Sequence, residues 1–369
     1  MAHGREGLSR TWLSYCLDWF IVIVFISIAG AFTLLQPVKR DFSLTDKTIS
    51  YPYRKDTISV AVLFIVAVVA PAAIIAIIST FVVKIPPRPG PEPSRRDVWK
   101  RKLWEVHATW LGLGLSLVLS FFLTQTMKNM FGKHRPDFLA RCSPNIGDMD
   151  KFLVGGYTSE VLEGTSQLVS AGICISSNGS GVGKSEFIDG FRSFPSGHCT
   201  IAFAGLTYLS LFLAAKLAVA IPFLPHTSQD AVRSERRIAA APPLYLLVIV
   251  LVPLGAAIYI ASTRFTDYKH HGFDVLFGSV EGIICAWFAF RYYHLPISRG
   301  AGWAWGPRHS SVAFGTGMNV KGYGHLGLYK GDESHTRTRN HTFTTGIELN
   351  HMEPVTTGGG SYESHRALV

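Results

Sequence analysis

The chain has 369 residues, of which 48% are hydrophobic and only 16% are charged, and its mean hydropathy is +0.24. These values are unlike those of an ordinary soluble domain and typical of a polytopic membrane protein. In a soluble protein the net charge of +10 would suggest a nucleic-acid partner. In a membrane protein it fits basic cytosolic loops that face anionic lipid, so we expect no nucleic-acid partner.

Apolar runs along the chain predict an all-α, polytopic membrane protein with six transmembrane helices. Each run is long enough to cross the hydrocarbon core of a bilayer. In chain order the runs cover residues 17–35, 57–83, 107–127, 199–224, 243–261 and 272–293. The first run is too long for a signal peptide and lacks a small-residue cleavage site, so we interpret it as a signal anchor.

This layout predicts three regions. Residues 1–103 hold the first two spans and a basic connector, and residues 104–295 hold the core with the other four spans. Residues 296–369 are rich in Gly, Thr, Ser and His without periodicity, so we expect a disordered cytosolic tail. Basic connectors before the third and fifth spans place those connectors and both termini in the cytosol. The polar loops at 128–198 and 262–274 then share the opposite side, in the lumen or at the cell exterior.

Two polar clusters stand beside the third and fourth spans. The first has the spacing K-x6-R-P, with Lys128, Arg135 and Pro136. Cations at the end of a span usually extend to the lipid headgroups, so this cluster is weak evidence alone. The second cluster, Pro-Ser-Gly-His, opens the fourth span with Ser196 and Gly197 followed by His198. It could be simple helix punctuation, but a Ser-Gly turn at a helix start also presents free amides to an anion.

The third cluster lies between the last two spans, and we interpret it as a short loop at the bilayer surface. It has the spacing R-x5-H-x3-D, with Arg264, His270 and Asp274. These residues could be an anion clamp, an imidazole and a carboxylate that orients it, although His270 could also be an ordinary surface histidine. One phosphate site explains the three clusters better than three unrelated coincidences. The neighbouring Lys133 and His134 could contact substrate, but we interpret them as side chains that face water.

The three clusters resemble the signature of the lipid phosphate phosphatase superfamily (type 2 phosphatidate phosphatases), which reads K-x6-R-P, P-S-G-H and S-R-x5-H-x3-D. The likeness covers about residues 104–293, and Thr263 stands where the family has serine. Further stretches resemble the eukaryotic membrane branch: Arg135-Pro136-Asp137-Phe138, Arg192-Ser193-Phe194 and Asp267-Tyr268-Lys269-His270-His271. The resemblance implies a phosphatase core like the helical bundle of the vanadium haloperoxidases.

The resemblance also implies a phosphohistidine mechanism that needs no cofactor and no metal. His270 would be the nucleophile, Asp274 would hold its tautomer, and His198 would protonate the leaving group and then activate water. The residues expected to bind the phosphate are Lys128, Arg135, Ser196, Gly197 and Arg264. The residues expected to support the site are Asp267, His271 and Pro136.

A site at the bilayer surface suits a phosphate ester whose acyl chains stay in lipid. Phosphatidate, lysophosphatidate, diacylglycerol pyrophosphate and sphingoid-base phosphates all qualify, and the sequence does not choose among them. A haloperoxidase is an alternative, but the six spans argue against it. A phosphatase of a sugar phosphate and a non-catalytic lipid-binding or transport relative also stay open. The endoplasmic reticulum, vacuole, Golgi and plasma membrane are all compatible locations.

Two further features lie in the loop at 128–198. Asn178-Gly179-Ser180 is an N-glycosylation sequon on the side predicted to be luminal. Cys142 and Cys174 lie on the same oxidising side and could form a disulfide. The five cysteines include no C-x-x-C pair, which argues against a zinc site.

Overall fold

The computed structural model describes residues 2–82, 94–155, 167–175, 183–219, 242–297, 302–308 and 313–314. All of these residues belong to one compact unit, Met1–Gly315. Asn178 and residues 315–369 lie outside the described residues, so the sequon and most of the predicted tail are not described.

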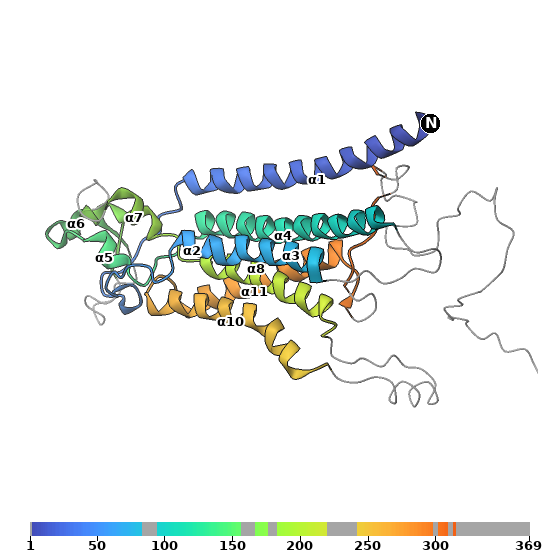
Figure 1. The fold of residues 1–369 in the computed structure, drawn as a ribbon. Helices are drawn as coiled ribbons and strands as arrows, with labels where there is room; N and C mark the ends of the chain where they lie inside the picture. Colours follow the sequence, from blue (N-terminus) through green and yellow to red (C-terminus); the bar gives the residue numbers. More distant parts are fainter. Residues whose placement is uncertain are drawn as a thin grey trace, which may run out of the picture. The chain divides into compact units, whose positions relative to one another are not determined.

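Six helical segments among the described residues are long and apolar enough to cross a membrane, which confirms the predicted all-α membrane fold. They lie alongside one another in Figure 1. The segments are α1 (Ala2–Leu34), the continuous run α2 (Val60–Phe64), η2 (Ile65–Val69), α3 (Ala70–Ile77) and η3 (Ile78–Val82), then α4 (Arg95–Phe131), α8 (Gly197–Lys216), α10 (Leu244–Thr266) and α11 (Gly272–Tyr293).

Several of the predicted span boundaries are wrong. α1 and α4 begin earlier than predicted, at Ala2 and Arg95 rather than near residues 17 and 107. α8 ends at Lys216 rather than near residue 224, because Ala218 turns the backbone into the left-handed region with φ +53°. α10 continues to Thr266, so Arg264 lies in the last helical turn and not in a surface loop. Only residues 267–271 separate α10 from α11. The third cluster is therefore held largely on two helix ends.

The second span contains Pro71 and changes its helical form along its length. Pro71 has no N–H for the carbonyl of Ala67 one turn earlier, and the segment η2 just before it is a π-helix. The Ala67 carbonyl faces α8 at Gly205, where a side-chain carbon would lie only 1.9 Å from the Ala67 oxygen. Glycine at 205 thus lets the two helices touch through their backbones.

α8 is the central helix and packs against α4, α10 and α11. It is the most enclosed of the six spans, whereas α1 exposes most of its side chains. Buried polar contacts join it to α4: the Tyr208 hydroxyl donates to the Thr109 carbonyl at 3.0 Å, and Ser116 Oγ donates to the Ala204 carbonyl at 3.1 Å. Because α8 is fixed on several sides, its first residues form a rigid platform.

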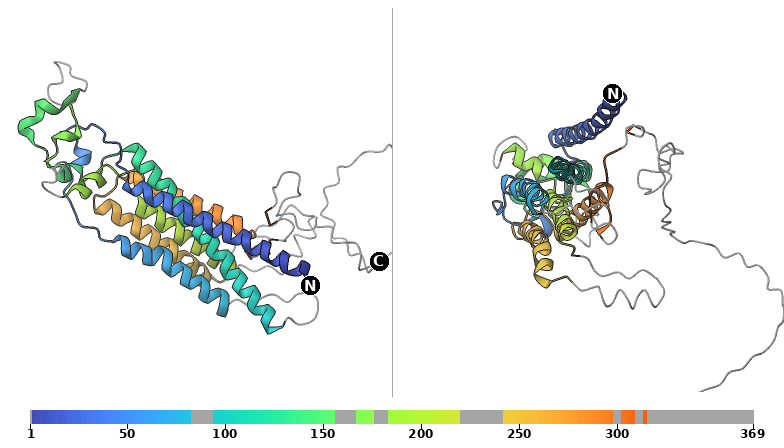
Figure 2. Two further views of the ribbon diagram at one scale, coloured as in Figure 1. Left: turned by 90° about the horizontal axis from the view of Figure 1, so that it is seen from above. Right: turned by 45° about the vertical axis from the view of Figure 1, so that its right-hand side comes forward.

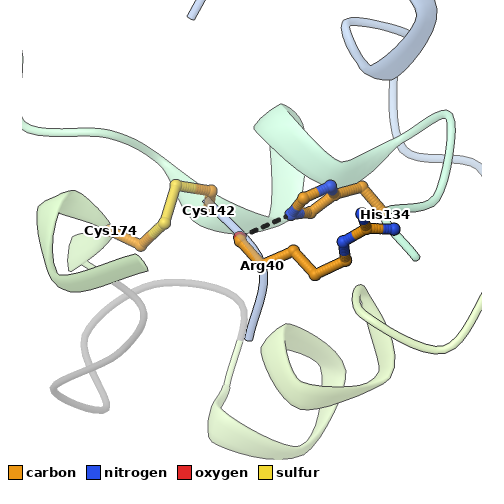
Figure 3. The surroundings of a disulfide bond; sticks show 4 residues. All are labelled: Arg40, His134, Cys142 and Cys174. Atoms are coloured by element: carbon orange, nitrogen blue, oxygen red, sulfur yellow. Dashed lines mark hydrogen bonds between the residues drawn. A yellow bond between two sulfur atoms is a disulfide. The ribbon is translucent and has the colours of Figure 1, made fainter. Parts of the chain in front are cut away.

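A small subdomain, here called the cap, comprises the described residues from Phe138 to Asp189. Its elements are α5 (Phe138–Cys142), η4 (Ile146–Asp148), α6 (Met149–Phe152), β1 (Leu153–Gly155), β2 (Leu168–Val169), η6 (Ala171–Ile173) and α7 (Lys184–Asp189). β1 and β2 pair antiparallel. Cys142 and Cys174 form a disulfide inside the cap (Figure 3). The cap has its own apolar core, in which both half-cystines are buried beside Phe138 and Phe187.

Residues 35–59, here called the first loop, join α1 to α2 and contain η1 (Lys47–Ile49). The loop runs at the end of the bundle that carries the cap (Figure 1). Phe42 and Ile49 enter the apolar core of the cap. At the start of the loop, Arg192 donates from Nη2 to the carbonyls of Thr33 and Leu35, at 3.0 and 2.5 Å, and so holds the end of α1.

Residues 302–308, here called the strap, lie at the opposite end of the bundle. The sequence assigns them to the tail, but they pack on helix ends. Trp305 N donates to the Tyr293 carbonyl at 3.0 Å, and Trp104 Nε1 donates to the Trp305 carbonyl at 2.8 Å. Arg308 pairs with Asp18 of α1 at 2.6 Å. The ordered core therefore extends beyond the predicted boundary at residue 295.

Candidate active site

The three motif clusters meet at the end of the bundle that carries the cap. α4 and α10 end there, and α8 and α11 begin there (Figure 2). Lys128, in the last turn of α4, lies against the first residue of α8: a side-chain carbon on Gly197 would be 3.2 Å from Lys128 Nζ. The first and second clusters are thus in direct contact.

Ser196 is the residue before α8 and presents an unused hydroxyl. Its side chain is fully buried, and its hydroxyl has no oxygen or nitrogen partner among the described residues, with only the weakly bonding Cys199 thiol beside it. Its backbone N donates to the Asp274 carbonyl at 3.2 Å, which joins the second and third clusters. A buried hydroxyl without a partner is costly, so a ligand that accepts its hydrogen bond would be favoured. The free amides of the first turn of α8 point to the same kind of ligand, an anion.

His270 is 2% exposed and is held by a backbone carbonyl. Its Nδ1 lies 2.6 Å from the Ser193 carbonyl. A carbonyl only accepts, so Nδ1 carries the proton and the lone pair lies on Nε2. Burial, together with the nearby cations of Arg135 and Lys128, lowers the pKa of His270 well below its usual value. The ring is therefore neutral at physiological pH, with its lone pair on Nε2.

The predicted contact between Asp274 and His270 is wrong. Asp274 Oδ1 accepts from Lys133 Nζ at 2.6 Å, and Oδ2 accepts from Ser193 Oγ at 2.6 Å and from His271 N at 3.2 Å. The physical reason is helix capping. His271 is the N-cap of α11 and Asp274 is its third residue, so the carboxylate folds back to the helix start. His270 precedes the helix and does not share its face with Asp274. Among the described residues, Ser193 links Asp274 to His270.

Arg264 is 1% exposed and its three nitrogens all donate to protein groups. Nη1 donates to Asp56 at 3.1 Å, Nη2 to Asp267 at 3.0 Å and Nε to Thr263 Oγ1 at 3.2 Å. Thr263 thus keeps a hydroxyl beside the guanidinium. Asp267, predicted only to support the site, contacts Arg264 directly. Asp56 belongs to the first loop and was not predicted.

Arg135 is held by Asp189, a residue that no motif indicates. Nε of Arg135 donates to the Asp189 carbonyl and Nη2 to its carboxylate, both at 2.9 Å. Arg141 joins Asp189 to Asp137, with which it makes two hydrogen bonds of 3.0 Å. Burial alone would raise the pKa of Asp189, but surrounding cations, chiefly Arg135, lower it. Asp189 of the cap thereby fixes the orientation of the Arg135 guanidinium.

The remaining predicted residues are also placed. Pro136 accepts from Tyr51 N at 2.9 Å through its carbonyl, and His271 contacts both Asp274 and the Thr48 carbonyl. The prediction that Lys133 and His134 face water is wrong. Lys133 pairs with Asp274, as described above. His134 packs on Phe138, and its Nε2 lies 3.0 Å from the Arg40 carbonyl (Figure 3). Burial lowers the pKa of His134.

His198 lies in the first turn of α8 and contacts the first loop. Its Nε2 lies 3.2 Å from the Ile58 carbonyl. The site therefore combines two imidazoles with three cations, one buried hydroxyl and the first amides of α8. This set can bind a tetrahedral dianion and stabilise the charge that develops on it. No group of three His, Cys, Asp or Glu side chains suited to a metal ion occurs among the described residues.

Sequence reasoning missed Asp56, Asp189 and Ser193. Ser193 stands inside a stretch already noted for its resemblance, three residues before Ser196, and a closer reading of that stretch could have marked it. Asp56 and Asp189 carry no comparable signal. Their importance comes from arginines 208 and 54 residues away in the chain, so only the fold reveals it.

Comparison with known proteins agrees with this geometry. A family model described as "PAP2 superfamily" matches residues 109–297. Diacylglycerol pyrophosphate phosphatase 1 of Saccharomyces cerevisiae is 30% identical over 281 residues, which cover 76% of this chain and 80% of that protein. Probable lipid phosphate phosphatase 4 of Arabidopsis thaliana is 28% identical, over 78% of this chain and 75% of that protein. Probable diacylglycerol pyrophosphate phosphatase 1 of Schizosaccharomyces pombe is 30% identical, over 72% and 75%. No solved structure gives a significant match.

Proposed function

Because the chain belongs to the PAP2 superfamily, we propose that it is an integral membrane lipid phosphatase that acts through a phosphohistidine. The observation that carries the proposal is the state of His270. A buried, neutral imidazole with its proton held at Nδ1 offers the lone pair of Nε2 beside two cations. That arrangement suits attack on a phosphorus atom better than it suits a structural role.

In the proposed first step, Nε2 of His270 attacks the phosphorus of the bound phosphate ester. Lys128, Arg135 and Arg264 bind the phosphoryl oxygens, with the Ser196 hydroxyl and the Gly197 amide as neutral donors. The bond from phosphorus to the leaving oxygen breaks, and His198 gives that oxygen a proton. The dephosphorylated lipid leaves, and the phosphoryl group stays on His270.

In the second step, His198 takes a proton from water as the water attacks phosphorus. The bond to Nε2 breaks, and inorganic phosphate is released with His270 restored. The carbonyl of Ser193 holds Nδ1–H throughout, so the ring keeps one orientation in both steps. Asp274 and Lys133 fix that carbonyl through the Ser193 side chain.

The position of the site and the names of the relatives support the proposed substrate class. The site lies at the ends of membrane-spanning helices, where a lipid can present its phosphate while its acyl chains stay in the bilayer. The relatives from both yeasts are named for diacylglycerol pyrophosphate, and the plant relative for lipid phosphates. We therefore take phosphatidate and diacylglycerol pyrophosphate as the first substrates to test.

The test is phosphate release from phosphatidate in detergent micelles with excess EDTA. The wild type should release phosphate, and His270→Ala should lower the rate by about 1,000-fold or more, because the nucleophile is lost. The matched control is His107→Gln, which changes a histidine on α4 that bonds Trp19, away from the motif clusters. That variant should keep its activity.

Two outcomes would contradict the proposal. Activity of His270→Ala within tenfold of the wild type would contradict a phosphohistidine intermediate on His270. Failure of the wild type to release phosphate from both phosphatidate and diacylglycerol pyrophosphate would remove the lipid substrate class.

A further inference from the structure

The three residues Asp56, Thr57 and Ile58 form the end of the first loop, just before α2. They lie well before residue 109, where the match to the family begins. Each nevertheless contacts one of the motif clusters or its immediate support. Asp56 contacts Arg264, Thr57 contacts Asp267, and Ile58 contacts His198.

The contacts to Arg264 fix its guanidinium from two sides. Asp56 takes Nη1, and Asp267 takes Nη2. Thr57 in turn holds both oxygens of Asp267, with its backbone N at 2.8 Å and its hydroxyl at 2.7 Å. Arginine has five N–H donors, and three are engaged by protein groups. One N–H on each terminal nitrogen is left for a phosphate.

The two carboxylates differ in exposure. The side chain of Asp56 is 42% exposed, whereas that of Asp267 is 8% exposed. Asp56 is thus the partner of Arg264 that faces solvent, where its charge repels an incoming phosphate. The Asp56 carboxylate therefore has two opposing effects. It holds the guanidinium in place, but its negative charge lowers the affinity of the site for an anion.

The contact to His198 fixes a tautomer. The Ile58 carbonyl accepts from Nε2, at 3.2 Å, so that nitrogen carries a proton. Proton transfer to the leaving group and from water then takes place at Nδ1. One short segment outside the matched domain thereby orients both the anion clamp and the acid–base histidine.

We infer that Asp56–Ile58 is a positioning segment of the active site, in which Asp56 aligns Arg264 for catalysis at the expense of anion affinity. The inference rests on the proposed phosphatase function, because alignment matters only for the transfer step. It makes a specific prediction: loss of the Asp56 charge should lower kcat and tighten anion binding at once. Loss of folding or of packing would weaken both.

The experiment compares Asp56→Asn with Asp56→Glu, and both with Asp46→Asn. Asp46 is a matched control from the same loop, since the hydrogen bonds of its carboxylate within the described part of the chain are local ones from Thr48, at 2.8 and 2.7 Å. Two quantities are measured on the full chain in detergent. The first is kcat with phosphatidate. The second is the affinity for orthovanadate, a phosphate analogue. This affinity is measured from the rise in thermal unfolding temperature as vanadate is added, so it does not depend on turnover.

For Asp56→Asn, we expect kcat to fall about tenfold and vanadate affinity to rise about threefold. Asp56→Glu should recover most of kcat, and Asp46→Asn should stay within about twofold of the wild type in both quantities. The inference is overturned if Asp56→Asn behaves like Asp46→Asn, or if its vanadate affinity falls together with kcat. If the wild type binds vanadate but releases no phosphate, the proposed function fails. A tighter vanadate site in Asp56→Asn would then still support the effect on anion affinity.

Discussion

At the scale of single residues, the orientation of His270 depends on a chain of supporting side chains and backbone groups. His270 is oriented by the Ser193 carbonyl, and Ser193 is held by Asp274, which pairs with Lys133. Asp274, which the motif places four residues after His270, thus acts on the histidine indirectly, through Ser193. A neutral carbonyl as the direct partner leaves the ring uncharged, which keeps its lone pair available for attack.

The lowered pKa of His270 predicts how stability depends on pH. In the unfolded chain a histidine takes up a proton near its usual pKa of about 6.5, whereas the folded ring does not. As the pH falls below that value, the unfolded state gains protons and is favoured. The folded wild type should therefore lose stability between pH 7.5 and 5.5, and His270→Gln should lose less over the same interval. Thermal unfolding in detergent at the two pH values measures both losses. Equal losses would contradict the assignment of this effect to His270.

At the scale of elements, helix ends carry the chemistry and helix contacts set where those ends lie. α8 presents the amides proposed to bind the anion, and it makes close backbone contact with the second span at Gly205. The same helix carries Gly197 against Lys128. A change in how α8 packs along its length would therefore move the amides relative to the cations.

Gly205→Ala tests that packing. The added carbon would lie 1.9 Å from the Ala67 carbonyl oxygen, so one helix must shift. We expect a loss of about 1–3 kcal/mol in stability, seen as a lower thermal unfolding temperature in detergent. The matched control is Gly30→Ala in α1, where no described atom beyond the local helix backbone lies within 4 Å of the added carbon. That variant should be unchanged or more stable by up to about 1 kcal/mol. Equal effects of the two substitutions would contradict a backbone contact at Gly205.

At the scale of the whole molecule, the six candidate spans among the described residues lead us to propose that both termini lie on the same side of the membrane. The charge distribution leads us to propose that this side is cytosolic and that the site end faces the lumen or the cell exterior. The disulfide in the cap agrees with an oxidising compartment on that side.

Glycosylation tests the orientation. The chain has two sequons, Asn178 in the loop at the site end and Asn340 in the tail. We expect deglycosylation to increase the electrophoretic mobility of the wild type and of Asn340→Gln, but not that of Asn178→Gln. A shift that disappears with Asn340→Gln would invert the orientation, and a wild type without any shift would contradict the use of Asn178.

The spans and the three motif clusters could be predicted because their signals are local. A run of apolar residues from 60 to 82 or a spacing such as that of Arg264, His270 and Asp274 is visible without a fold. The pairings of Asp56 and Asp189 with arginines could not, since the partners come together only when the cap and the first loop fold over the helix ends. The strap was missed for a related reason. Its composition resembles that of a tail, and its order comes from contacts with α1 and α4.

The two arginines that hold α1 have a consequence for biosynthesis. α1 leaves the ribosome before the other described spans, but it is held at one end by Arg192 and at the other by Arg308. Arg308 lies 290 positions after its partner Asp18. At usual rates of translation, about 15–60 s separate the synthesis of the two residues. The first transmembrane helix must therefore wait in the bilayer without its final partners. Most of the side chains described in α1 are apolar and most are exposed, so the helix can stay in the bilayer during this interval without exposing many polar groups to lipid.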